Sequence, residues 1–145
     1  LAMLKTLGLN GMRQYIANQM AITLYLRDTK APGFVVANRE ALGFNTMLLV
    51  IPLAYRDSVK NYEDFLEKAN SDPNFLIDAN GLVNNLYQKS LEVSRLGCSF
   101  SKSFAVTADG RKISGLKYTI VSPHASNRFI DKEFVVLGKI LQIVE

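Results

Sequence analysis

The stretch from Cys98 to Val121 constrains the fold most, because it has the pattern of two strands joined by a tight turn. Its first part alternates two sets of side chains, with Cys98, Phe100, Lys102, Phe104 and Val106 in one set and Ser99, Ser101, Ser103 and Ala105 in the other. A period of two is typical of a half-buried strand. Asp109-Gly110 is a strong hairpin signal, and Ile113–Val121 is the expected return strand. We therefore predict an antiparallel hairpin.

A second strand pair is predicted nearer the start of the chain. Phe34–Val36 and Phe44–Ile51 are short apolar runs that are rich in β-branched residues, and Pro52 closes the second of them. Because the two runs are adjacent, an antiparallel pairing between them is expected.

Four helices are predicted around these strands. The first spans about 9–26 and carries an apolar stripe of Met12, Ile16, Met20 and Leu24. The second is capped by Asp57 or Ser58 and carries Val59, Tyr62, Leu66 and Ala69. The third begins near Asp78 or Asn80 and ends before a left-handed Gly97. The last is capped by Ser126 or Asn127, with a stripe of Ile130, Phe134, Leu137, Leu141 and Val144.

The resulting order of elements, αββααββα, predicts a single α+β domain over residues 1–145. Two hairpins separated by helices favour a two-layer fold, with an antiparallel sheet of about four strands and helices packed on one face. With 48% hydrophobic and 21% charged residues, the chain has the composition of an ordinary globular domain. The longest apolar runs are too short to span a membrane.

The charge and cysteine content exclude several kinds of partner. The formal net charge is +4, but the lysines and arginines are scattered, so we expect no nucleic-acid partner. The lone Cys98 cannot form an internal disulfide or a zinc cluster, which favours a cytoplasmic location and no metal. No glycine-rich phosphate loop occurs.

Candidate site residues are few. His124 follows Pro123 at a strand end, where it could lie over a ligand or simply be exposed. Cys98 is expected to be buried as a small hydrophobic side chain, because no base is evident nearby. Lys117 is a cation in the middle of an apolar strand, on the face of Gly115 and Thr119, where it could meet a carboxylate or only solvent. No catalytic residue and no cofactor-binding residue is predicted in this chain.

Three stretches together resemble the group II pyridoxal phosphate-dependent decarboxylases, the family of glutamate, aromatic amino acid and diaminobutyrate decarboxylases. Leu4–Met12 is similar to the family pattern LKxLGxxG, and Phe44–Thr46 is similar to the start of LNTVVFR. Leu116–Pro123, which reads LKYTIVSP, resembles LRxxIxNP, and the helix after it begins as the family's does.

The resemblance implies that the chain is the C-terminal small domain of a fold-type I decarboxylase, a carboxy-lyase that is usually a homodimer. Residues 1–30 would be the helix that leads from an upstream cofactor domain, which would carry the pyridoxal phosphate. The small domain would close over an amino acid substrate. Lys117 stands where some members have an arginine for the substrate carboxylate, and His124 is a further substrate-binding candidate. The isolated chain would not be catalytic.

Two departures and two alternatives accompany this resemblance. Lysine replaces the arginine and loses its planar two-pronged geometry, and Ser122 replaces the usual asparagine. One alternative is a small α+β ligand-binding or interaction domain without catalysis. The other is the small domain of another fold-type I enzyme, such as an aminotransferase.

Overall fold

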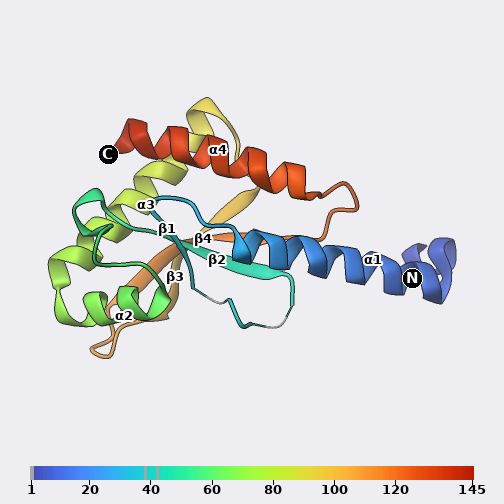
Figure 1. Cartoon of the computed structure of the whole chain (residues 1–145), viewed down its shortest axis with the longest axis horizontal. Coiled ribbons are helices and arrows are strands. Elements are labelled where there is room, and N and C mark those ends of the chain that lie inside the picture. Colours follow the sequence, from blue (N-terminus) through green and yellow to red (C-terminus); the bar gives the residue numbers. More distant parts are fainter. Residues whose placement is uncertain (1, 38, 42) are drawn as a thin grey trace.

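The computed structural model describes residues 2–37, 39–41 and 43–145, and it has the predicted order of elements (Figure 1). Residue 1 of the predicted 1–30 helix lies outside the described residues. The elements are α1 (Ala2–Asp28), β1 (Phe34–Val36), β2 (Asn45–Val50), the 3₁₀ helix η1 (Leu53–Tyr55), α2 (Tyr62–Ser71), α3 (Pro73–Val93), β3 (Cys98–Val106), β4 (Lys112–Thr119) and α4 (Asn127–Val144).

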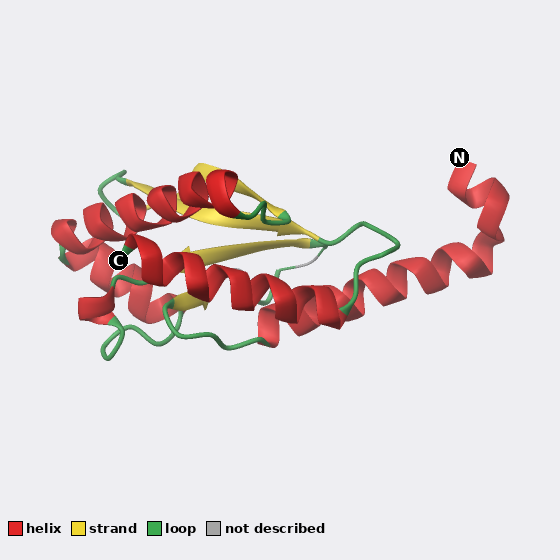
Figure 2. Cartoon of the chain, turned by 90° about the horizontal axis from the view of Figure 1, so that it is seen from above, coloured by secondary structure: helices red, strands yellow, loops and turns green. Residues whose placement is uncertain are grey.

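The four strands form one antiparallel sheet in the order β1-β2-β4-β3. Both predicted hairpins are present, and the pairing of β2 with β4 joins them, with Met47 opposite Lys117 and Leu48 opposite Leu116. Figure 2 shows the strands as one layer, with the helices packed along it. The predicted α+β fold class is therefore confirmed.

The main core lies between one face of the sheet and the helices α1, α3 and α4. Its members include Leu48, Leu116 and Tyr118 from the strands, Leu86 from α3, and Ile130 and Leu137 from α4. A second cluster uses the alternate residues of β2, with Met47 and Leu49 packed together with Phe65 of α2 and Phe75 of α3. Since successive strand residues point to opposite faces, β2 is buried on both sides.

The prediction that the apolar stripe of α1 packs on the domain is wrong. Ile16 is 45% exposed and Leu24 is 49% exposed, whereas Thr23 and Arg27 are buried. The physical reason is that Leu26 packs in the main core from this face, and that the polar side chains of Thr23 and Arg27 are paired. The Thr23 hydroxyl donates to the Gln19 carbonyl, and Arg27 donates to the segment that leads into β2. Gly8 interrupts the helix, with a φ of 68°.

The predicted starts of α2 and α3 are also wrong. Asn61, and not Asp57 or Ser58, caps α2 by accepting from the Asp64 N–H. Helix α3 begins at Pro73, because Asp72 accepts from two backbone N–H groups of the first turn and proline suits the first helical position. The turn chemistry seen in the sequence is in fact a helix start.

Two predictions around β3 need correction. Gly97 does not have a positive φ; α3 ends at Val93, and a Cβ at Gly97 would lie 2.7 Å from the Phe129 ring. The strand pattern breaks at a register shift between Ser101 and Ala105. Phe100 therefore packs on the main core, whereas Phe104 packs on the second cluster.

The remaining end of the chain follows the sequence pattern. Gly110 has a φ of 83° in the predicted hairpin turn, and Ser126 caps α4 by accepting from the Phe129 N–H. The apolar stripe of α4 packs on the main core, as predicted. None of the described helices is long and apolar enough to cross a membrane.

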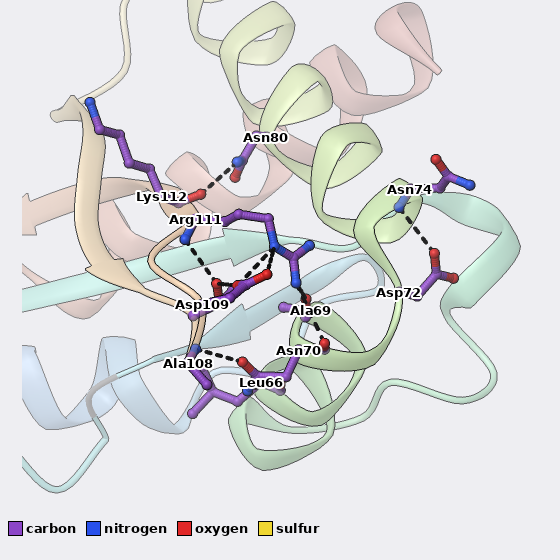
Figure 3. A network of polar contacts seen from close by, with 11 residues as sticks. Leu66, Ala69, Asn70, Asp72, Asn74, Asn80, Ala108, Asp109, Arg111 and Lys112 are labelled. Carbon is purple, nitrogen blue, oxygen red and sulfur yellow. Dashed lines mark hydrogen bonds and ion pairs between the residues drawn. The ribbon is translucent and has the colours of Figure 1, made fainter.

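A polar network ties the β3–β4 hairpin to α2 and α3 (Figure 3). The Arg111 guanidinium donates to the Ala69 carbonyl over 2.9 Å, near the C-terminal end of α2. The Asn70 amide oxygen accepts from the Ala108 N–H at 2.8 Å. Asn80 of α3 both donates to and accepts from the β4 backbone, at 2.8 and 3.0 Å. These contacts satisfy backbone groups that the ends of the elements would otherwise leave unpaired.

Candidate functional site

Lys117 lies near the C-terminal end of β4, paired with Met47 of β2 on one side and with Ser99 of β3 on the other. Its side chain is exposed, although Leu116 and Tyr118 on either side of it are fully buried. The strand therefore presents this lysine on the face of the sheet that carries the second cluster, at the point where the face opens to solvent.

The neighbours of Lys117 along β4 on this face are small or polar. Gly115 is buried, and a Cβ there would come within 3.1 Å of the Leu48 carbonyl oxygen. At the other side, the Thr119 hydroxyl donates to the Asn45 side-chain oxygen over 2.6 Å. An ammonium on such a surface is open to an anion such as a carboxylate, which it would bind as a point charge.

The carboxylate of Glu133 contacts β4 from the opposite face of the sheet. Both the Tyr118 hydroxyl and the Gly97 N–H donate to the Glu133 carboxylate, each over 2.9 Å. Tyr118 is 0% exposed, and burial raises the pKa of its phenol, so it remains a donor. The sequence analysis missed Glu133, although its place on the apolar face of α4, three residues after Ile130, was a usable signal.

Cys98 sits next to this group, partly buried against the main core as expected. Burial raises the pKa of its thiol to about 12. At about pH 8 we therefore expect iodoacetamide to label the folded protein at least ~100-fold more slowly than the protein in urea, because the thiolate is the nucleophile. Equal labelling rates for the folded and the urea-unfolded protein would contradict the burial of the Cys98 thiol.

The raised pKa of Cys98 also predicts a pH dependence of stability. The thiol of the unfolded chain ionises at pH ~8.5, so the free energy of unfolding should fall as the pH rises from there towards 12.

His124 is exposed in the segment before α4, and its backbone N–H donates to the Ser122 hydroxyl at 3.2 Å. This contact gives the residue a local turn role. A role in substrate binding stays a prediction.

Arg27 is a further residue that the sequence analysis missed. It is 4% exposed, and its guanidinium donates to Thr46 and to the carbonyls of Ala41, Gly43 and Asn45. It also lines a cleft of about 1100 Å³ beside β1, which Lys117 does not line. Arg27 thus places the start of β2, and with it Asn45 and Met47 beside Lys117.

Lys117 and Glu133 do not together fit a resident pyridoxal phosphate. Pyridoxal phosphate needs a lysine for its imine and an acidic partner for its ring nitrogen. Here Lys117 lies on the open face of the sheet, whereas Glu133 is bonded to Tyr118 on the opposite face. No group of three histidine, cysteine or acidic residues within the described ranges could hold a metal ion.

Comparison with known proteins shows the fold. No protein-family model matches the chain, and no curated protein does. A crystal structure of mouse CSAD, cysteine sulfinic acid decarboxylase, matches 95% of this chain with a TM-score of 0.71 and 15% identity. Its apo form matches 98% with a TM-score of 0.67 and the same 15% identity.

The fold is that of the C-terminal part of a pyridoxal phosphate-dependent decarboxylase. This chain spans 26% of the length of the CSAD chain, as a domain of a larger polypeptide would. At this level of identity the likeness shows the fold and not the activity.

Proposed function

We propose that this chain is the C-terminal small domain of a pyridoxal phosphate-dependent amino acid decarboxylase. The likeness to mouse CSAD over 95% of the chain carries the proposal, and the stretches LKTLGLNGM, FNT and LKYTIVSP support it. In this proposal an upstream domain of the same polypeptide binds the cofactor and supplies the catalyst. The full-length enzyme is a cytoplasmic homodimer that acts on a small amino acid.

Exposed apolar side chains on α1 support the proposal that a further domain exists. Leu9 is 61% exposed, and Ile16 and Leu24 of the same helix are 45% and 49% exposed. The N-terminal part of α1 extends beyond the sheet (Figures 1 and 2). An apolar stripe on a protruding helix is costly to leave in water, so a covering partner is expected.

The parent enzyme itself can be identified directly. Native polypeptide captured from its source with an antibody against this chain should be several times longer than 145 residues. After borohydride reduction, peptide mapping should find a pyridoxyl-lysine upstream of Leu1. A stable native product of this chain alone would contradict the proposal and favour a binding domain.

Within the proposed enzyme, Lys117 binds the substrate carboxylate. Lys117→Ala in the full-length protein is then expected to lower kcat/KM by roughly 10- to 100-fold, because a charge-assisted hydrogen bond is lost. Lys117→Arg should retain most of the activity, since it preserves the charge. Lys102→Ala is the matched control, because Lys102 is an exposed lysine of the edge strand β3. Unchanged kinetics in Lys117→Ala would remove the residue from the site.

A further inference from the structure

Glu133 is a buried carboxylate on the inner face of α4, between Ile130 and Leu137 of the main core. It is 9% exposed, and no ion pair among the described residues includes it. Burying a charge without a cation is costly unless hydrogen-bond donors replace the lost water. The role of this carboxylate therefore depends on which donors meet it.

One oxygen of the carboxylate connects α4 to two strands. Glu133 Oε2 accepts from the Tyr118 hydroxyl and from the Gly97 N–H, each over 2.9 Å. Gly97 directly precedes β3, and Tyr118 is the last residue but one of β4. A single side chain of the helix thus holds the start of one strand and the end of its neighbour.

These two contacts lie beside Lys117 in the sheet. Tyr118 is opposite Cys98 in the pairing of β3 with β4, and Lys117 is opposite Ser99. Successive strand residues point to opposite faces, so holding the Tyr118 side chain in the core directs Lys117 out of the other face. The orientation of β4 about its own axis is therefore fixed at the residue next to the lysine.

The hydrogen bonds between the strands give this end of the hairpin limited support. β3 is an edge strand, so β4 is its only neighbour in the sheet. Their register shifts between Ser101 and Ala105, which interrupts the ladder between this end and the hairpin turn. The contact from α4 therefore adds a constraint that the ladder does not provide.

From these observations we propose that Glu133 is a positioning residue for Lys117. It contacts β4 from the face opposite the lysine and does not touch the substrate. It acts by holding Tyr118 and the start of β3 so that the Lys117 ammonium points at the substrate carboxylate. The inference rests on the proposed function, in which Lys117 binds that carboxylate.

Steady-state kinetics of the full-length enzyme test this role through a double-mutant cycle. Glu133→Leu is expected to raise KM by about 3- to 10-fold with less effect on kcat, because a misplaced ammonium weakens substrate binding. The same substitution in a Lys117→Ala background should change kcat/KM no further, since the lysine that Glu133 positions is already gone. A substitution that only destabilised the fold would act equally in both backgrounds.

Three further variants separate positioning from general stability. Glu133→Gln keeps an oxygen that can accept both bonds, so it should retain the KM of the unsubstituted enzyme. Tyr118→Phe removes one donor and fills the same space, so it should raise KM about 2- to 3-fold, and it replaces Glu133→Leu in the cycle if that variant does not fold. Asn80→Leu is the matched control and should leave KM unchanged. Asn80 also ties a helix to β4, but through Lys112 and Ser114 at the other end of the strand.

The outcomes distinguish this inference from the proposed function. Loss of the Glu133→Leu or Tyr118→Phe effect in the Lys117→Ala background is the expected result. If Lys117→Ala loses activity but its effect and that of Glu133→Leu or Tyr118→Phe simply multiply, the positioning role is overturned and the role of Lys117 stands. If Lys117→Ala leaves the kinetics unchanged, both roles are overturned.

Discussion

Replacing Arg27 with leucine is expected to lower the free energy of unfolding by about 3 to 5 kcal/mol, because the change strips partners from several buried polar groups at once. The guanidinium donates to the Asn45 carbonyl at 2.8 Å, to the Gly43 carbonyl at 3.1 Å and to the Thr46 hydroxyl at 3.2 Å. Leucine can fill part of the volume but donates nothing, so these acceptors would remain unpaired.

Urea unfolding followed by circular dichroism would measure this loss, and Arg39→Leu is the matched control. Arg39 pairs with Asp28 at the surface, where an ion pair contributes at most about 1 kcal/mol. Arg27→Lys should lie between the two, because lysine preserves the charge but not the planar fork of donors. Similar losses for Arg27→Leu and Arg39→Leu would show that the buried contacts are not what holds the start of β2.

Gly33→Ala is expected to lower the free energy of unfolding by about 2 to 5 kcal/mol, from two causes that add. Gly33 has a φ of 86°, a conformation that costs an L-residue about 1 to 2 kcal/mol. A Cβ there would also come within 2.8 Å of the Arg56 guanidinium and of the Leu141 side chain. Relieving such overpacking costs roughly 1 to 3 kcal/mol. Arg56 cannot easily move, because it is bonded to the Ile51 carbonyl and to Glu145.

A substitution at a second glycine is the control, and its expected effect on stability has the opposite sign. Gly81 lies inside α3, and a Cβ there would meet nothing within 4 Å. Gly81→Ala should therefore raise the free energy of unfolding by about 0.5 to 1 kcal/mol through helix propensity. The same urea experiment compares the two variants. If Gly33→Ala were as well tolerated as Gly81→Ala, the close approach of Gly33 to Arg56 and Leu141 would be incorrect.

Local patterns were sufficient for much of this fold. The Asp109-Gly110 hairpin, the short strand Phe34–Val36 and the apolar stripe of α4 all appear where the sequence predicts them. Each depends on interactions within a few residues, such as a positive φ at glycine or one buried helix face. The exposure of Lys117 on the strand face opposite Tyr118 also follows from simple alternation.

Other features depended on contacts between distant segments. Periodicity in α1 predicts an apolar face but not what it packs against, and here the paired polar face of Thr23 and Arg27 turns inward. The pairing of β2 with β4 brings Met47 beside Lys117, although 70 residues separate them. Glu133 meets Gly97 and Tyr118 only in the folded domain. The alternation of side chains depends on one segment alone. The partner of a buried polar group, in contrast, is a group that only the tertiary structure brings within hydrogen-bonding distance.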